Sequence, residues 1–264
     1  MVNALIFDCD GVIADTERFG HLPAFNQTFE EFGLPVRWSE EEYGVKLKIG
    51  GGKERMASLL TEEFVRQAHL PTDAESQQHL LSTWHKRKTA HFKEIVQAGH
   101  LPGRPGIARI VQEAIANHWK LAIASTSAEE SVRTILEHVV GREQAAYFEV
   151  LAGDIVPKKK PAPDIYLLAL ERLDSGPAET IIIEDSRNGL LAAVAAGLRC
   201  VVTLSSYTID EDMHEATLVV SHLGDPDRPM RVQANRGQAT PNVYVTLHDI
   251  QACLEPLTQP AKDV

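Results

Sequence analysis

Three short apolar runs in this chain each end in a cluster of polar residues, and this pattern limits the possible folds most strongly. The runs are Ala4–Phe7, Lys120–Ala124 and Thr180–Ile183, and two further apolar runs lie at Phe148–Ala152 and Cys200–Leu204. Apolar runs of this length are typical of buried strands. Five buried strands spread over about 200 residues require a layer of other elements on each face of their sheet.

Amphipathic helical patterns lie between these strands and provide those layers. The patterns cover residues 107–115, 132–139, 166–173 and 190–196. Strands that alternate with helices of this length predict βαβ units. We therefore expect an α/β fold with a Rossmann-like, doubly wound parallel sheet.

One region breaks the alternation of strands and helices. Residues 17–96 show helical periodicity throughout, interrupted at Gly50–Gly52, and they predict an all-helical domain inserted after the first strand. The catalytic α/β core is then formed by residues 1–16 and 97–222. Residues 223–264 form a C-terminal extension to which we assign no role, with a strand-like run at Val243–Leu247 and a short helix after it.

Composition excludes several classes of protein. The 264 residues carry a formal net charge of −11, which argues against a nucleic-acid or anionic-membrane binder. No run of about 18 apolar residues predicts a membrane-spanning helix. The three cysteines lack metal-site spacing and favour a reducing compartment. We expect a monomer in the cytoplasm, or in the plastid stroma if the host is a photosynthetic eukaryote.

The polar clusters follow strands whose carboxyl ends meet at one edge of the sheet, where open α/β sheets bind ligands. Asp8 and Asp10 are two apart, so in an extended segment both carboxylates share a face. That spacing suits a nucleophile and a general acid/base beside a divalent metal. When such a pair stands alone, a solvated turn or a helix cap is the far commoner setting.

Three more clusters join the pair at this edge. Glu184 and Asp185 offer oxygen ligands for a hard cation, and Ser125-Thr126 offers hydroxyl and backbone N–H groups to a phosphate. Taken singly, each of these also fits a helix N-cap. Lys160 adds a positive charge, although lysines before a proline commonly lie in a solvated loop.

Taken in order, these clusters resemble the four signatures of the haloacid dehalogenase superfamily. Asp8-Cys9-Asp10-Gly11 matches the first signature, Ser125 the second, Lys160 before Pro161 the third and Glu184-Asp185 the fourth. The inserted helical domain lies where many members carry a helical cap. The resemblance implies the haloacid dehalogenase fold and a phosphotransfer enzyme.

Further segments are similar to the CbbY-like group of that superfamily. They include Asp15-Thr16-Glu17, Gly20-His21, Lys48–Met56 and Gly153–Pro161. This resemblance covers residues 2–222 and implies a phosphatase that converts xylulose 1,5-bisphosphate, an inhibitor of Rubisco in the Calvin cycle, to xylulose 5-phosphate. It implies a small phosphorylated sugar as the partner molecule.

The resemblance assigns roles to the residues at the sheet edge. Asp8 is expected to be the nucleophile and Asp10 the general acid and base, while Ser125 and Lys160 neutralise the phosphoryl oxygens. One Mg²⁺ is expected on the Asp8 carboxylate, the Asp10 carbonyl and Asp185, with Glu184 a ligand directly or through water.

Residues of the helical insertion are expected to select the substrate. Lys53 and Arg55, assisted by backbone N–H groups of Gly51 and Gly52, would hold a second phosphate, and Glu17 and His21 would bind sugar hydroxyls. The full set of expected substrate-binding residues is Glu17, His21, Gly51, Gly52, Lys53, Arg55, Ser125, Thr126, Ser127 and Lys160. Lys86, Arg87 and Lys88 are typical of a solvated helix face.

Alternative functions share the same residues at the sheet edge. A mutase resembling β-phosphoglucomutase would return the phosphoryl group from Asp8 to another hydroxyl. A phosphoglycolate or sugar-monophosphate phosphatase would lack the second phosphate site. A non-catalytic sugar-phosphate sensor would not need both Asp8 and Asp10.

Overall fold

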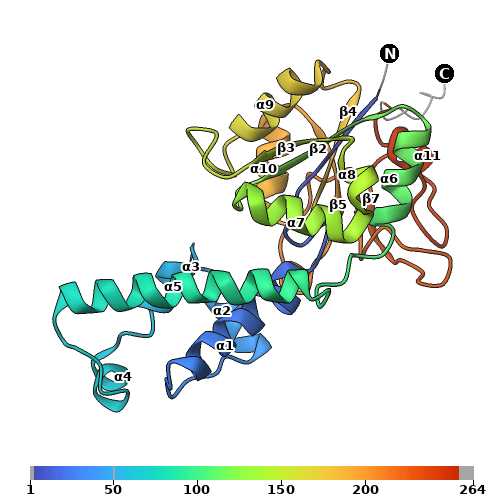
Figure 1. Ribbon diagram of the computed structural model, residues 1–264. Helices are drawn as coiled ribbons and strands as arrows, with labels where there is room; N and C mark the ends of the chain where they lie inside the picture. The colour runs from blue at the N-terminus through green and yellow to red at the C-terminus, as the bar shows by residue number, and fades with distance from the viewer. Residues whose placement is uncertain (1–2, 50, 256–264) are drawn as a thin grey trace, which may run out of the picture. The chain divides into compact units, whose positions relative to one another are not determined.

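The computed structural model of the protein describes residues 3–49 and 51–255, and it contains two compact units. The sheet unit contains residues up to Asp15 and those from Pro102 onward. The cap unit is Thr16–Leu101. Figure 1 shows the strands and the long helix α5 that distinguish the two units.

A seven-stranded sheet forms the centre of the sheet unit. Its order is β3-β2-β1-β4-β5-β6-β7, and every neighbouring pair is parallel except β6 and β7. The strands are β1 (Ala4–Phe7), β2 (Lys120–Ser125), β3 (Phe148–Ala152), β4 (Thr180–Glu184), β5 (Arg199–Thr203), β6 (Leu218–Val220) and β7 (Val232–Asn235). The five strands expected from the apolar runs are confirmed, and their parallel pairing confirms the doubly wound α/β class.

Helices cover both faces of this sheet (Figure 1). Helices α9 and α10 pack on one face, and α6 and α7 pack on the other with α8 and α11 beside them. The helices are α6 (Ile107–Ala116), α7 (Glu129–Val140), α8 (Arg142–Ala145), α9 (Asp164–Leu173), α10 (Arg187–Ala195) and α11 (Leu247–Ala252). The four helical patterns between the strands are thereby confirmed as α6, α7, α9 and α10.

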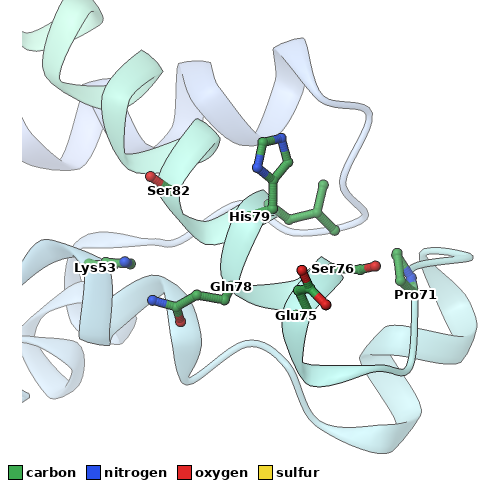
Figure 2. A pocket seen from close by; sticks show the side chains of 8 residues that line it. Lys53, Pro71, Glu75, Ser76, Gln78, His79 and Ser82 are labelled. Carbon is green, nitrogen blue, oxygen red and sulfur yellow. The ribbon is translucent and has the colours of Figure 1, made fainter.

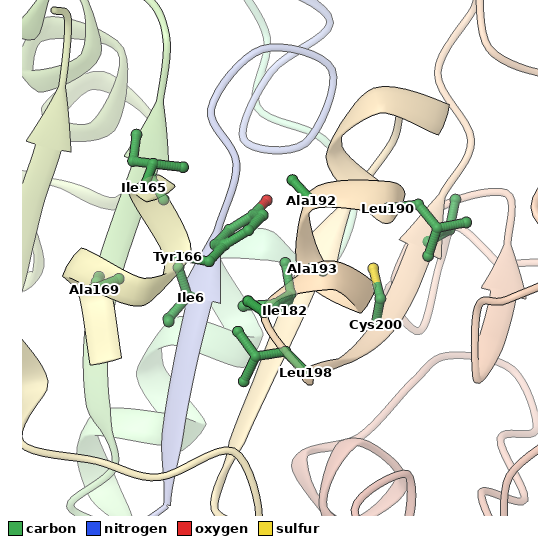
Figure 3. Close-up of a cluster of buried hydrophobic side chains, with 14 of the residues drawn as sticks. Ile6, Ile165, Tyr166, Ala169, Ile182, Leu190, Ala192, Ala193, Leu198 and Cys200 are labelled. Atoms are coloured by element: carbon green, nitrogen blue, oxygen red, sulfur yellow. The ribbon is translucent and has the colours of Figure 1, made fainter. Parts of the chain in front are cut away.

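Alternate side chains of the strands build the core on the α9–α10 face (Figure 3). Ile6 of β1 and Ile182 of β4 point to this face and contact a cluster that includes Tyr166 of α9. Their neighbours Phe7 and Ile183 point to the opposite face, because successive side chains of a strand alternate. All of these residues are fully buried, so the register of the central strands is fixed from both sides.

The expected strand at Val243–Leu247 is wrong. Thr246 instead caps helix α11: its hydroxyl accepts the N–H of Asp249, whose carboxylate accepts the N–H of Thr246. Two strands, β6 and β7, are added to the five expected, and the side chains of β7 are mostly exposed and show no apolar pattern. Pairing with β6 creates this strand, and local sequence preference does not.

The cap unit is entirely helical, as expected. Its elements are the π-helical turn η1 (Glu17–His21), α1 (Leu22–Glu31), α2 (Glu40–Lys46), α3 (Gly52–Ala57), α4 (Glu62–Gln67) and α5 (Ala74–Gln97). The apolar pattern from Met56 to Phe64 is divided between two helices, because Thr61 caps α4 with its hydroxyl. Of the glycine triplet, Gly50 lies outside the described residues, Gly51 precedes α3 with φ +94°, and Gly52 is already helical.

Candidate active site

The predicted clusters gather at the carboxyl edge of the sheet unit. Asp8 directly follows β1, Ser125 ends β2, and Glu184 ends β4. Strand β1 lies between β2 and β4, so these three positions are neighbours across the sheet. Lys160 reaches the same edge from the segment between β3 and α9.

Lys160 connects the clusters. Its ammonium donates to Asp8 Oδ1 at 2.6 Å, to Glu184 Oε1 at 2.7 Å and to the carbonyl of Ala124 at 2.9 Å. These three bonds use all three N–H groups of the ammonium. The two carboxylates raise the pKa of Lys160 despite its burial. Lys160 therefore stays charged beside Asp8, where a phosphoryl group would need a cation.

Glu184 is fully buried, and both of its oxygens accept hydrogen bonds from the protein. Besides Lys160, Oε1 accepts the hydroxyl of Tyr166 at 2.6 Å. The backbone N–H groups of Asp185 and Ser186 bond Oε2 at 3.0 and 3.3 Å. The ion pair with Lys160 lowers the pKa of Glu184 against the effect of burial. The geometry makes Glu184 an anchor for Lys160.

The carboxylates of Asp8, Glu184 and Asp185 form a group whose ligand atoms lie within 4.8 Å of one another. Burial raises the pKa of Asp8 to about 7; Lys160 opposes this shift, and Glu184 and Asp10 add to it. Burial, Glu184 and Asp8 likewise raise the pKa of Asp185. Three buried carboxylates facing one ammonium carry excess negative charge, which a hard divalent cation would neutralise.

Gly11 allows Asp185 to enter this group. It has φ +81°, and a Cβ atom at this position would lie 2.1 Å from Asp185 Oδ2. Only a glycine permits both that backbone conformation and that close approach. The acidic group can therefore hold a metal on Asp8 and Asp185, with Glu184 already committed to Lys160.

The polar cluster at the end of β2, Ser125–Ser127, holds Asp10 in place. The hydroxyl of Ser127 donates to Asp10 Oδ2 at 2.5 Å, and the N–H of Ser127 bonds Ser125 Oγ at 3.1 Å. Ser125 is buried, whereas Thr126 is exposed. Ser127, expected to bind substrate, thus bonds the candidate acid/base directly.

Cys9 lies between the two aspartates in sequence and is fully buried. Burial and the two neighbouring carboxylates raise the pKa of its thiol. It packs as a neutral side chain, as the strand alternation implies.

In the cap unit, Arg55 belongs to a polar cluster with Glu17 and Tyr43. Its guanidinium lies 3.5 Å from Glu17 Oε2 and donates to the Tyr43 hydroxyl at 3.0 Å, while its Nε donates to the carbonyl of Ile49 at 3.0 Å. Tyr43 donates its own proton to Glu17. The cluster holds the guanidinium in a fixed orientation.

Lys53 has different surroundings from Arg55, because residues two apart on helix α3 do not share a face. It lines a pocket of about 700 Å³ at the start of α5, where Figure 2 shows it opposite Gln78 and Ser82. The two cations expected to share one phosphate therefore lie in separate environments of the cap unit.

The expectation of a solvated face is wrong for Lys88. This residue is 7% exposed, its ammonium lies 2.8 Å from His21 Nδ1, and it stands 4.6 Å from the ring centre of Phe25. Burial, with the charge of Lys88 next, lowers the pKa of His21 well below its usual range. His21 is therefore neutral, and its Nδ1 accepts from Lys88. The helix period of α5 turns Lys88 inward, while Arg87 pairs with Glu31 outside.

Three polar side chains support these clusters, and sequence analysis did not predict their roles: Tyr43, Lys88 and Tyr166. Each stands at a position whose helical period indicates burial, so a hydroxyl or ammonium there needs a partner. A polar side chain at a position that the helical period predicts to be buried was therefore the signal available in the sequence. The partners come from 12 to 67 residues away, and sequence spacing does not identify them.

Comparison with known proteins places this site in a family. Residues 2–197 match the model of the haloacid dehalogenase-like hydrolases. A "CBBY-like protein" of Arabidopsis thaliana is 45% identical over 224 residues, covering 85% of this chain and 70% of the relative. "Protein CbbY" of Rhodobacter capsulatus is 42% identical, covering 81% of this chain and 91% of the relative.

Solved structures agree with these relatives. CbbY from Rhodobacter sphaeroides is 37% identical, with a TM-score of 0.69 over 84% of this chain and 95% of that chain. It has been solved with phosphate and, as the mutant D10N, with xylulose-(1,5)bisphosphate. The chain therefore belongs to the haloacid dehalogenase-like hydrolase family, among its CbbY-like members.

Proposed function

We propose that this hydrolase is a metal-dependent phosphatase that removes one phosphate from a small sugar bisphosphate through an aspartyl-phosphate on Asp8. The observation that carries the proposal is the Lys160 ammonium, 2.6 Å from Asp8 and anchored on Glu184 at 2.7 Å. A buried cation held beside a carboxylate nucleophile is suited to an incoming phosphoryl dianion.

In the first step, an oxygen of Asp8 attacks phosphorus and the bond from phosphorus to the sugar oxygen breaks. Asp10 donates its proton to that oxygen, so the alcohol leaves neutral. Ser127 holds Asp10 in position for this transfer, with its hydroxyl 2.5 Å from Oδ2. In the second step, water attacks phosphorus, Asp10 accepts a proton from the water, and the bond from phosphorus to the Asp8 oxygen breaks, which releases inorganic phosphate and free Asp8.

The acidic group supports Mg²⁺ as the metal, because all its ligands are carboxylate oxygens. Bound there, the ion would neutralise charge on the transferring phosphoryl group. Asp8 and Asp185 are the proposed carboxylate ligands, and the carbonyl of Asp10 remains a proposed third. We assign Glu184 to Lys160, since five donors of the protein already bond its two oxygens.

The substrate class rests on the relatives and on the charges of the cap unit. The xylulose-(1,5)bisphosphate complex of the Rhodobacter sphaeroides protein makes this sugar bisphosphate the first candidate here. Arg55, fixed by Tyr43 and Ile49, is the proposed ligand of the second phosphate, and His21 and Glu17 are proposed for the sugar hydroxyls. Lys53 is proposed to contribute less than Arg55 to binding of the second phosphate. A role in removing this Rubisco inhibitor follows from the same proposal.

The test is a screen of about a dozen sugar monophosphates and bisphosphates, with release of inorganic phosphate as the readout, in Mg²⁺ and in excess chelator. We expect fastest release from xylulose 1,5-bisphosphate and none in chelator. An isomerised sugar phosphate without phosphate release would identify a mutase. Equal rates on monophosphates would identify a general sugar phosphatase. The monomeric state and the cytoplasmic or stromal location stay predictions. The helices of the described residues include none with the length and hydropathy of a membrane span.

A further inference from the structure

Arg104 lies where the chain re-enters the sheet unit, and its guanidinium bonds four backbone carbonyls. It donates to the carbonyl of Gly11, to Thr203 at 3.0 Å, and to Leu204 and Ser221 at 2.6 Å each. Its own N–H bonds the carbonyl of Ile13 at 2.9 Å. One side chain therefore joins the segments that follow β1, β5 and β6.

Those carbonyls belong to the segments that shape the acidic group. Gly11 follows Asp10 directly and lies against the carboxylate of Asp185. Leu204 precedes Ser205, whose hydroxyl hydrogen-bonds Asp185. Strand β4 lies between β1 and β5 in the sheet, so a group bonded to the ends of β1 and β5 spans the end of β4, where Asp185 begins.

The contacts require an arginine. A guanidinium offers five N–H donors in a rigid plane, whereas an ammonium offers three from a single point. The planar guanidinium of Arg104 can therefore bond four carbonyls from three segments, which an ammonium could not. Arg104 also interacts electrostatically with Asp185 and Asp15, so its charge is directed toward the acidic edge.

We infer that Arg104 is a positioning residue for the metal-binding carboxylates: it fixes the distance between the Asp8–Gly11 loop and Asp185 through the carbonyls of Gly11 and Leu204. This inference rests on the proposed metal-dependent function. Loss of the guanidinium leaves the acidic residues chemically unchanged. The segments that carry Gly11 and Leu204 are then no longer connected by hydrogen bonds to one side chain. Metal affinity then falls, because Mg²⁺ tolerates little deviation from octahedral geometry.

Arg109 provides a matched control in the same unit. Its guanidinium donates to the carbonyls of Leu223, Gly224 and Val245 at 3.4, 2.7 and 2.8 Å, and these segments carry none of the three carboxylates of the proposed metal site. Replacing Arg109 removes a comparable set of carbonyl contacts. It separates loss of stability from loss of metal positioning.

The experiment measures the dissociation constant of Mg²⁺ by calorimetry on the full chain, with thermal unfolding and turnover of p-nitrophenyl phosphate alongside. We compare wild type, Arg104→Met, Arg104→Lys and Arg109→Met. We expect the dissociation constant to rise at least tenfold in both Arg104 variants, and to stay within twofold in Arg109→Met although its Tm falls. Arg104→Lys keeps the charge, and it provides the measurement if Arg104→Met does not fold.

Three results would overturn the inference, and the first two are Mg²⁺ affinity within twofold of wild type in folded Arg104→Met and an equal loss of affinity in Arg109→Met. Full recovery in Arg104→Lys would also overturn it, because charge alone would then suffice. Failure of the proposed function gives a different result, since wild type itself would then bind no Mg²⁺ and release no phosphate.

Discussion

Asp8 is the residue on which the proposed chemistry depends, and its replacement by asparagine preserves its shape. The amide oxygen of the new side chain would still accept from Lys160, so the fold should persist. We expect Asp8→Asn to lower turnover of p-nitrophenyl phosphate by at least ~10³-fold, because the covalent route is lost. Asp154→Asn is the control, since that aspartate is exposed and pairs with Lys159. A variant of Asp8 that retains a tenth of the activity would contradict the assignment.

Tyr166 supports Glu184 through one hydrogen bond of 2.6 Å inside the core. Tyr166→Phe removes that donor and keeps the ring over Lys160. We expect a loss of about 1.5–3 kcal/mol in the free energy of unfolding, the usual value for a hydrogen bond to a charged group. Turnover should change less than tenfold, because Lys160 and the backbone N–H groups still hold Glu184. Urea unfolding measures the loss, and Tyr147→Phe, at an exposed tyrosine, should show none.

At the scale of elements, helix α10 approaches β4 so closely that Gly189 touches Glu184. A Cβ atom on Gly189 would lie 1.8 Å from Glu184 Oε1. Gly189→Ala should destabilise the protein by about 1–3 kcal/mol, as overpacking does, and this exceeds the ~1 kcal/mol that alanine gains in a helix. Turnover should fall with it, because a displaced Glu184 no longer anchors Lys160.

Gly176→Ala is the matched control for this prediction, since nothing lies within 4 Å of a Cβ there. Its stability and turnover should match wild type within about 1 kcal/mol and twofold. If Gly189→Ala is as stable and active as Gly176→Ala, the close approach of α10 to Glu184 contributes neither to stability nor to turnover.

The cap elements should act on specificity separately from the sheet unit. Arg55→Ala removes the proposed ligand of the second phosphate, and we expect it to cost about 2–4 kcal/mol in kcat/KM for xylulose 1,5-bisphosphate. With p-nitrophenyl phosphate the cost should be below ~1 kcal/mol. The ratio of the two kcat/KM values is the measurement. Arg66→Ala, an exposed arginine of α4, should leave that ratio unchanged; an unchanged ratio in Arg55→Ala would remove Arg55 from substrate recognition.

At the scale of the whole molecule, the buried acidic group makes stability depend on pH. Asp8 has a pKa of about 7 in the fold and 3.8 as a free group. Its raised value means that the folded state binds the extra proton, so its contribution is complete below pH 3.8 and is lost as pH rises toward 7. Without metal, Asp8→Asn should therefore become increasingly stable relative to wild type across this interval.

Urea unfolding of both proteins in chelator, from about pH 4.5 to 7.5, measures that difference. Adding Mg²⁺ should reduce it near pH 7, because the ion stabilises the folded wild type by binding there. A stability difference that does not vary with pH would show that ionisation of Asp8 does not destabilise the folded protein.

Local patterns in the sequence predict strands β1–β5, the helices between them and the four clusters at the sheet edge. These features are local: a buried strand shows as an apolar run, a helix as a period of 3.6, and a strand end as the polar residue that follows. Asp8, Ser125, Lys160 and Glu184 were therefore identifiable with no knowledge of their contacts. The family resemblance, carried by the same clusters, is confirmed by the family match.

The partners of those residues depend on contacts that form only in the folded chain. Glu184 binds Lys160 and Tyr166, Lys88 turns inward to His21, and Arg104 joins carbonyls up to 117 residues away. Strand β7 exists because β6 offers it an edge, while the more apolar Val243–Leu247 run becomes a helix cap. Such choices depend on which buried donors and acceptors meet across the fold. Burial makes an unpaired polar group costly, and only the assembled chain shows where each partner lies.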